Sequence, residues 1–287
     1  MTVEHRLRIG DRNVLLVEGP AGWGECSPLP GYPCEYDAAR AAAEEAATRG
    51  WPAPVRSVVS VNGFVAAAAS LADEHASAVL CEYPSVKVKV GRLSPDDEVN
   101  RIARVRDLIG PTVGLRVDAN GAWDVETAVA TLTRLARYDL EFAEQPVASL
   151  SDLRAVRRRV TVPIAADECV RSVADARRLH ATDAADVLVL KVQPLGGVRA
   201  ALAIADAARV PAVVSSMYET SIGLAAGLAL AAALPTLPFA CGLATLAEIA
   251  GDVTATPLEP HHGVLTIDAA FPPQPSSELL ARYAVAA

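Results

Sequence analysis

The sequence predicts an α/β fold in which a closed barrel of parallel strands carries a small α+β cap. From about residue 54 onward, short apolar runs alternate with helical segments, and the alternation recurs often enough to give eight strands. Alternating strands and helices form parallel sheets, and eight parallel strands joined by similar crossovers match a TIM-type (β/α) barrel. A hairpin-like segment before this region and a polar segment after it supply the cap.

Each predicted barrel strand is short and apolar. The eight runs are VVSV (58–61), SVKVKV (85–90), VGLRVD (113–118), LEFAE (140–144), VPIAAD (162–167), DVLVLK (186–191), PAVVSS (211–216) and PFACG (238–242). The segments between them carry helix signals, such as S-P-D-D at 94–97 as a start and Gly110-Pro111 as a stop. This order of elements favours a barrel, although the sequence alone does not show closure.

The two ends of the chain predict the cap. Residues 13–25 (NVLLVEGPAGWGE) predict a β-hairpin that turns at 19–22, and residues 38–48 predict a helix that stops at Gly50-Trp51-Pro52. After about residue 250 the chain becomes polar and rich in proline. We therefore expect an N-terminal part of the cap at 1–53, the barrel at 54–250 and a segment at 251–287 that returns to the cap.

Composition disfavours nucleic acids and membranes as partners. The 287 residues carry a net charge of −8 and only 5% aromatic residues, which suits neither a phosphate backbone nor stacked bases. The most apolar stretch, 222–234, is shorter than the roughly 20 residues of a membrane span and predicts a buried barrel helix. No secretory h-region opens the chain, and its cysteines form no C-x-x-C pair. We expect a cytoplasmic location; whether the protein is a monomer or a homo-oligomer stays open.

Ionisable residues mark the carboxyl ends of consecutive predicted strands, which is where barrel active sites lie. They are Lys87 and Lys89, Asp118, Glu144, Asp167 and Lys191. Three converging carboxylates repel one another unless a cation neutralises them, and oxygen ligands favour Mg²⁺, with Mn²⁺ as a substitute. We predict that Asp118, Glu144 and Asp167 hold this ion. Ordinary ion pairs at strand ends are the alternative for any one of them.

The lysines suit proton transfer. Lys87 and Lys89 lie two residues apart on one strand and share a face, so each is expected to lower the proton affinity of the other and one can act as a general base. Beside a bound Mg²⁺, such a base can remove a proton α to a carboxylate. Lys191, across the barrel, could protonate the other face, stabilise charge or lie over a substrate ring. The sequence leaves these roles open.

Motifs around these residues resemble the muconate-lactonizing-type enolase superfamily over essentially the whole chain. They are K-V-K (87–89), R-V-D-A-N (116–120), E-Q-P (144–146), A-D-E (166–168) and K-V-Q (191–193). Within it, G-E-C-S-P-L-P-G (24–31), S-S-M-Y-E-T-S-I-G (215–223) and C-G-L-A-T-L (241–246) resemble the o-succinylbenzoate synthases, particularly their actinobacterial form. The resemblance implies a modified (β/α)7β barrel and a small-molecule carboxylate as substrate.

By that resemblance the reaction is a syn dehydration of 2-succinyl-6-hydroxy-2,4-cyclohexadiene-1-carboxylate to o-succinylbenzoate in menaquinone biosynthesis. Lys89 would take the α-proton and assist departure of the hydroxide, Lys87 would tune it, and Lys191 would face the ring. Arg116, Asn120 and Glu168 would support the metal ligands.

Two loops are implied in substrate binding. One comprises Ser27, Pro28, Leu29, Pro30 and Gly31, and the other supplies Ser215, Ser216, Ser221 and Gly223. A rigid turn for the first loop and a helix N-cap for Ser221 are the structural alternatives. The sequence departs from the family in its short N-terminal cap and at Met217, Tyr218 and Thr220, which stand where small residues or serine are common.

Other activities stay open at this stage. The nearest is an epimerase or N-acylamino acid racemase of the same superfamily, with Lys89 and Lys191 as bases on opposite faces; the absence of a D-x-D motif in PFACGLAT disfavours dipeptide epimerases. A Schiff-base aldolase that uses Lys191 without a metal belongs to a different class. A barrel that binds but does not catalyse is expected to lack at least one of these lysines or carboxylates, and none is missing.

Overall fold

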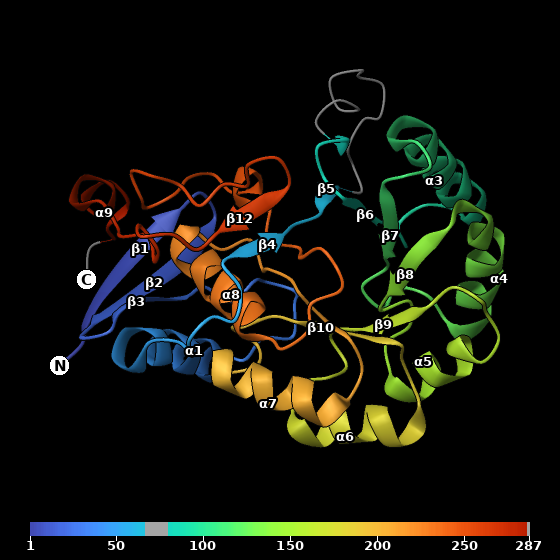
Figure 1. Cartoon of the computed structure of the whole chain (residues 1–287), viewed down its shortest axis with the longest axis horizontal. Helices are drawn as coiled ribbons and strands as arrows, with labels where there is room; N and C mark the ends of the chain where they lie inside the picture. The colour runs from blue at the N-terminus through green and yellow to red at the C-terminus, as the bar shows by residue number, and fades with distance from the viewer. Residues whose placement is uncertain (67–79, 286–287) are drawn as a thin grey trace.

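The computed structural model describes residues 1–66 and 80–285, and its centre is a curved parallel sheet (Figure 1). The described strands of this sheet follow the order β11-β10-β9-β8-β7-β6-β5. They are β5 (Gly63–Val65), β6 (Ser85–Lys89), β7 (Gly114–Asp118), β8 (Leu140–Glu144), β9 (Ile164–Ala166), β10 (Val187–Leu190) and β11 (Ala212–Val214). Sequential neighbours pair in parallel, which confirms the predicted α/β barrel class.

Two residues of the eighth predicted run join the ends of the sheet. Cys241 bridges in parallel to Val61, and Gly242 bridges in parallel to Ser215. The Cys241 amide donates to the Ser60 carbonyl at 2.7 Å, and the Gly242 amide donates to the Val214 carbonyl at 2.8 Å. The run PFACG therefore closes the barrel through isolated bridges, without forming a longer strand.

The prediction for the first barrel strand was wrong in position. Residues 58–60 form β4 (Val58–Ser60), which pairs antiparallel with β12 (Val264–Thr266), and the barrel strand is β5, which begins at Gly63. In β4 only the central residue is buried, since Val58 and Ser60 are exposed. An alternating strand of this kind suits a two-stranded ribbon, whereas a barrel strand is covered on both faces.

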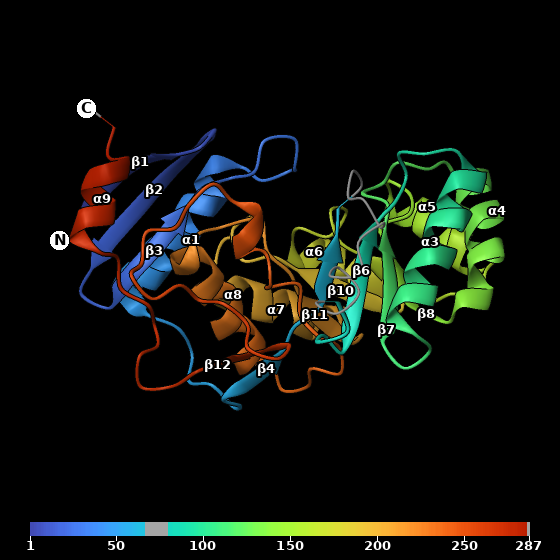
Figure 2. The same cartoon turned by 90° about the horizontal axis from the view of Figure 1, so that it is seen from above.

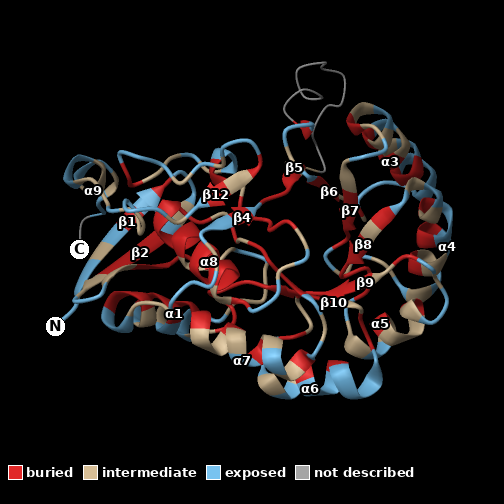
Figure 3. Ribbon diagram, viewed as in Figure 1, coloured by how far each residue is buried: buried red, intermediate tan, exposed pale blue. Residues whose placement is uncertain are grey.

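Helices cover the outside of the sheet (Figure 1). They are α3 (Pro95–Ile109), α4 (Val125–Leu135), α5 (Leu150–Arg157), α6 (Val173–Thr182), α7 (Val198–Ala208) and α8 (Ser221–Ala233), with short 3-10 turns η1 (Ala136–Tyr138) and η2 (Leu246–Glu248). Ser94, Asp124, Ser149 and Ser172 cap the first four of these helices by accepting a backbone N–H three residues on. Strands and inner helix faces are buried while outer faces are exposed (Figure 3).

The cap is a three-stranded antiparallel sheet with two helices. Its elements are β1 (Val3–Ile9), β2 (Arg12–Gly19), β3 (Gly22–Cys26), α1 (Tyr36–Arg49) and α9 (Ser277–Tyr283). The β2–β3 hairpin turns between Gly19 and Gly22 as expected, whereas β1 was not predicted. Helix α1 packs so closely on β3 that a Cβ at Gly24 would lie 2.1 Å from the carbonyl oxygen of Ala43.

The C-terminal segment returns to this sheet. The Val285 amide donates to the Arg6 carbonyl at 3.0 Å, and Leu7 bridges to Ala284. Both chain ends therefore lie at the cap (Figure 2). The exact boundaries at 53 and 250 stay a prediction.

Helix α8 joins the cap to the barrel. Eleven of its residues are buried, and it lies against β3 and against β11. The apolar run that was predicted as a buried helix therefore has protein on all sides. Within residues 1–66 and 80–285, no helix is both long and apolar enough to cross a membrane.

Candidate active site

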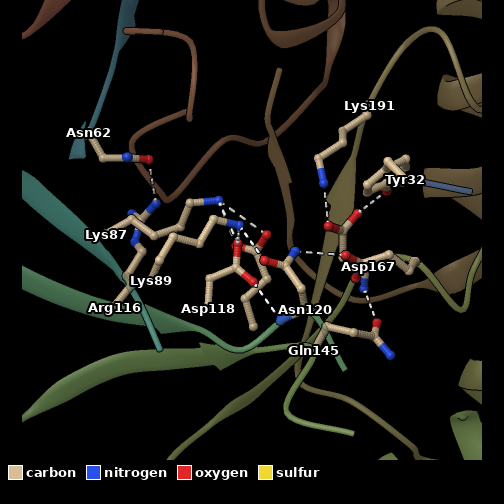
Figure 4. A network of polar contacts seen from close by, with 12 residues as sticks. Tyr32, Asn62, Lys87, Lys89, Arg116, Asp118, Asn120, Gln145, Asp167 and Lys191 are labelled. Carbon is tan, nitrogen blue, oxygen red and sulfur yellow. Dashed lines mark hydrogen bonds and ion pairs between the residues drawn. The ribbon is translucent and has the colours of Figure 1, made fainter. Parts of the chain in front are cut away.

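Charged side chains from consecutive strands meet at one rim of the barrel (Figure 4). Lys89 pairs in register with Asp118, and Asp118 with Glu144, across β6, β7 and β8. Asp167 directly follows β9, and Lys191 directly follows β10. Since parallel strands end at the same edge, this register brings the predicted lysines and carboxylates into one cluster.

Each carboxylate of the cluster is buried and paired with a lysine. Lys87 Nζ lies 3.1 Å from Glu144 Oε1 and 3.3 Å from Asp118 Oδ2, so it spans both carboxylates. Lys89 Nζ lies 2.6 Å from Asp118 Oδ2, and Lys191 pairs with Asp167. Lys87, Lys89 and Lys191 are also all the lysines that the sequence contains. Every other strongly basic side chain is an arginine, which singles out these three amines.

The three carboxylates suit a divalent cation in their chemistry. They form an all-oxygen donor set without imidazole or thiolate, which favours Mg²⁺ or Mn²⁺. Burial, followed by the charge of Asp118, raises the pKa of Glu144 to about 7, so the set is costly to ionise fully without an additional cation. As the side chains stand, no group of three acidic, histidine or cysteine residues in the described ranges is spaced to hold a metal. Lys87 and Lys89 occupy oxygens of Asp118 and Glu144 that the ion would bind.

The protonation of the lysines differs from the expectation drawn from their spacing. Burial lowers the pKa of Lys87, but the charges of Glu144 and Asp118 outweigh it and hold the pKa above the ordinary value of a lysine. Lys191 shows the same balance, with burial opposed chiefly by Asp167, and its pKa is also raised. The net pKa of Lys87 and Lys191 is therefore raised and not lowered, because carboxylates surround each of these two amines.

Lys89 is the most accessible amine of the cluster. Its side chain is 21% exposed, against 9% for Lys87 and 7% for Lys191. It also donates to the Asn120 side chain at 2.6 Å. Among the lysines, Lys89 is thus best placed to meet a molecule in the pocket.

Asn120 hydrogen-bonds to the cluster and to Glu168, whereas Arg116 has other partners. The Asn120 amide donates to Asp118 Oδ1 at 3.0 Å, and its side chain donates to Glu168 Oε1 at 2.8 Å. Asn120 has φ 48°, a left-handed conformation that asparagine tolerates well. Arg116 donates instead to Glu141 Oε2 at 2.7 Å and lies over the ring of Phe142 at 4.7 Å. Arg116 points to the same side of β7 as Asp118 but lies two residues earlier in the strand, so its side chain lies deeper in the barrel, below the rim.

A pocket of about 910 Å³ opens above the cluster, and the three lysines lie in its lining. Of the predicted substrate-binding residues, it includes Leu29, Pro30, Gly31, Ser215 and Ser216. Ser27, Pro28, Ser221 and Gly223 are absent from the lining. The pocket is therefore framed by both predicted loops, although not by all of their predicted residues.

Ser221 and Gly223 have their polar groups occupied by other parts of the protein. The Ser221 amide and hydroxyl donate to Asp252 at 2.9 and 2.6 Å, and the Gly223 amide donates to Glu25 Oε2 at 3.0 Å. The helix N-cap is Thr220. The prediction that these groups bind substrate was wrong because acidic side chains of the cap and the C-terminal segment already satisfy the start of α8.

Ser27 likewise bonds to other parts of the protein and does not face the pocket. It is fully buried; its hydroxyl donates to Glu25 Oε1 at 2.6 Å, and its amide donates to the Gln193 side chain at 2.8 Å. Ser27 therefore anchors the loop from within, and the pocket lining begins at Leu29.

Sequence reasoning missed Tyr32 and Arg12. The Tyr32 hydroxyl donates to Asp167 Oδ1 at 2.8 Å, and its ring lies 4.2 Å from Lys191 Nζ, so it covers the Lys191–Asp167 pair. Arg12, on β2, donates to the carbonyls of Met217 and Tyr218 at 3.1 and 3.0 Å. Tyr32 directly follows the predicted loop, which was a usable signal, but nothing in the sequence pointed to Arg12.

The raised pKa of the buried Glu25 should make the stability of the protein depend on pH. Burial raises its pKa from 4.5 to about 7, so between these values the native protein holds a proton that the unfolded chain has released. The contribution of Glu25 to stability is fully present below pH 4.5 and declines as pH rises to 7, by about 3 kcal/mol. The Glu25→Gln variant cannot ionise there. Thermal unfolding across this window should show the wild type losing several degrees relative to the variant, and parallel curves would contradict the assignment.

Family models and structures of known proteins agree with this architecture. Residues 63–273 match the family described as enolase C-terminal domain-like, and residues 1–47 match the family described as enolase N-terminal domain-like. The muconate lactonizing enzyme from Pseudomonas putida superposes with a TM-score of 0.87 at 20% identity, covering 99% of both chains. At this level of identity the likeness establishes the fold.

Curated relatives are much closer in sequence. The o-succinylbenzoate synthase of Thermobifida fusca (strain YX) is 52% identical over 261 residues, which cover 89% of this chain and 81% of the relative. The o-succinylbenzoate synthase of Mycolicibacterium smegmatis is 44% identical, with 91% and 81% covered. Together with the strand-end lysines and carboxylates, these comparisons show that the chain belongs to the o-succinylbenzoate synthase family of the enolase superfamily.

Proposed function

We propose that this protein is a lyase that uses Mg²⁺ to dehydrate 2-succinyl-6-hydroxy-2,4-cyclohexadiene-1-carboxylate to o-succinylbenzoate, as a step of menaquinone biosynthesis. The observation that carries the proposal is the rim at which Lys89 and Lys191 flank Asp118, Glu144 and Asp167. The 52% identity to a curated o-succinylbenzoate synthase supports this substrate over others of the superfamily.

The carboxylates would hold the ion. A bound Mg²⁺ would supply positive charge against the negative charge that develops on the substrate carboxylate. The dependence of enolase-superfamily enzymes on divalent metals agrees with this assignment.

Lys89 would carry both proton transfers. Its Nζ takes the α-proton, the electron pair of that C–H bond enters the ring, and the C–O bond on the same face breaks. The resulting ammonium returns the proton to the departing hydroxide, which leaves as water. One amine therefore suffices for a syn elimination. Lys191 stays charged beside Asp167, in keeping with its raised pKa, and faces the ring from the other side.

The raised pKa of Lys191 also argues against a Schiff-base aldolase, since that chemistry needs a neutral amine.

All five cysteines lie in the described ranges and are free, which supports a cytoplasmic location. Leu29–Gly31 and the hydroxyls of Ser215 and Ser216 are proposed to contact the succinyl side chain, since they line the pocket. The proposed partner is this small dicarboxylate, with no nucleic acid or membrane.

The test is turnover of the cyclohexadiene substrate, followed by the ultraviolet absorbance of the aromatic product, with Mg²⁺ and with EDTA. We expect product only with the ion. An N-succinylamino acid in D₂O tests the rival, because Lys89 and Lys191 on opposite faces could also support racemisation. The proposal would be overturned in favour of a racemase if deuterium entered the N-succinylamino acid while the cyclohexadiene substrate gave no aromatic product.

Tyr32 should matter for turnover through two separable contacts. In Tyr32→Phe the ring over Lys191 remains while the hydrogen bond to Asp167 is lost. A hydrogen bond to a charged group contributes about 1.5–3 kcal/mol, so kcat/KM should fall by roughly tenfold or more. Tyr32→Ala also removes the ring and should lower kcat/KM by a further factor of about 2–5. Steady-state kinetics check both values; equal losses in the two variants would show that the ring contributes nothing.

A further inference from the structure

Glu25 is a buried acid that the proposed reaction does not use. It lies one residue before the end of strand β3 of the cap, is only 4% exposed, and yet lies against the barrel. Four donors surround its carboxyl group: the Ser27 hydroxyl, the Thr220 amide and hydroxyl, and the Gly223 amide. A buried carboxyl group is costly unless it is hydrogen-bonded, so these contacts hold the backbone that provides them in a narrow range of positions.

The partners of Glu25 belong to both loops that frame the pocket. Ser27 begins the loop that continues to Leu29–Gly31, and Thr220 lies two residues after Tyr218, which lines the pocket. Gln193 strengthens the junction, since it accepts from the Ser27 amide at 2.8 Å and follows two residues after Lys191. One carboxyl group in the cap thus fixes the distance between two walls of the pocket.

Arg12 binds the same two loops from strand β2. Its guanidinium donates to the carbonyls of Met217 and Tyr218 and to the carbonyl of Ser27. Tyr218 has φ 58°, an uncommon conformation for a tyrosine that the surrounding contacts must maintain. Arg12 binds backbone carbonyls just before the start of α8, and Glu25 binds backbone amides at that start. Two residues of the cap therefore hydrogen-bond to the two ends of the segment 217–223.

We propose that Glu25 is a positioning residue for the reaction: by tying Ser27 to Thr220 and Gly223, it sets the separation of the pocket loops and so the fit of the substrate side chain. This inference rests on the proposed function for its substrate. Glu25 has no contact with the lysines or carboxylates of the barrel rim among its hydrogen bonds in the described residues. Its loss should therefore weaken substrate binding more than chemistry.

Asp252 offers a matched control. It also caps the start of α8, by accepting from the Ser221 amide and hydroxyl, but its other partner is Thr254 in the C-terminal segment and none of these residues lines the pocket. Glu25→Ala and Asp252→Ala each remove a carboxyl group that accepts hydrogen bonds from the start of the same helix. Only the first also releases a pocket loop.

The experiment compares KM, kcat and thermal stability of Glu25→Ala, Glu25→Gln and Asp252→Ala at a temperature where all are folded. We expect Glu25→Ala to raise KM at least tenfold with kcat lowered less than threefold, Glu25→Gln to recover only part of this loss because its amide nitrogen cannot accept a hydrogen bond, and Asp252→Ala to lose stability with KM within twofold of the wild type. An unchanged KM in Glu25→Ala, or an equal rise in Asp252→Ala, overturns the proposal.

If Glu25→Ala does not fold, Ser27→Ala decides, because it removes the hydroxyl link between Glu25 and the first loop, together with one hydrogen bond from the Gln193 side chain, and keeps the backbone bond of Ser27 to Gln193. A KM raised severalfold supports the proposal, and a KM within twofold of the wild type overturns it. The Mg²⁺ concentration for half-maximal activity should be the same in every variant. Failure of the proposed function would appear differently, as absence of turnover in the wild type.

Discussion

Replacing Lys89 with alanine should lower kcat by about 10²–10⁴-fold, the usual contribution of a general acid–base group. Its amine is the most exposed of the three lysines at the rim, and it lies between Asp118 and Asn120. Without it, the remaining lysines are held close to Glu144 and Asp167 and cannot take its place on the same face. Steady-state kinetics of the cyclohexadiene substrate measure the loss.

Two controls separate chemistry from folding in this variant. Thermal unfolding should show that Lys89→Ala is folded, and Mg²⁺ should still raise its melting temperature, because the three carboxylates are intact. Lys89→Arg keeps the charge but has a guanidinium that cannot give up its proton at neutral pH, so it should be as inactive as the alanine variant. Turnover near the wild-type rate in either variant would remove Lys89 from the mechanism.

Replacing Glu144 with glutamine should abolish the response to Mg²⁺ and lower turnover by roughly 10²–10⁴-fold. Glu144 is the central carboxylate of the three in strand order, and metal ions stabilise developing charge by several kcal/mol, where each 1.36 kcal/mol is a factor of ten. An ion that binds only the native state raises the melting temperature, by about 2.7 kcal/mol of stability at one hundred times its Kd. In Glu144→Gln this increase should be lost or greatly reduced.

Glu141→Gln is the matched control. Glu141 lies on the same strand and accepts from Ser85 and Arg116, away from the rim. This variant should keep the Mg²⁺-dependent rise in melting temperature and most of the activity, even if it is less stable. A full Mg²⁺ response in Glu144→Gln, or its loss in Glu141→Gln, would show that the ion binds elsewhere.

Much of the barrel and its rim could be predicted from the sequence because two regularities coincide. Strand-like runs recur at intervals of about one strand and one helix, and Lys89, Asp118 and Glu144 fall at the ends of three consecutive runs. In a parallel sheet this spacing fixes which side chains meet, and the observed register pairs these three positions directly. The position of each residue at the end of its own strand was therefore enough to predict that the three side chains lie close together.

The errors occurred where contacts depend on packing between the cap and the barrel. Ser221 and Gly223 were assigned to substrate from the resemblance to the family, but Glu25 and Asp252, distant in sequence, occupy their donors. The raised pKa of Lys87 had the same origin, since two carboxylates from other strands outweigh burial. No local pattern specifies which of many acidic residues will approach a given donor.

The signal that sequence reasoning overlooked is the scarcity of lysine. The three amines at the rim are all the lysines of the chain, so lysine-specific isotope labelling yields three side-chain signals from the site itself. This property allows a direct test of whether the ion binds among them.

The measurement is a titration of lysine-labelled protein with Mn²⁺, followed by nuclear magnetic resonance. If Asp118, Glu144 and Asp167 hold the ion, the paramagnetic metal should broaden all three lysine signals together at one equivalent, and excess Mg²⁺ should restore them. Lysine signals that remain sharp at saturating Mn²⁺ would contradict a metal site at this rim.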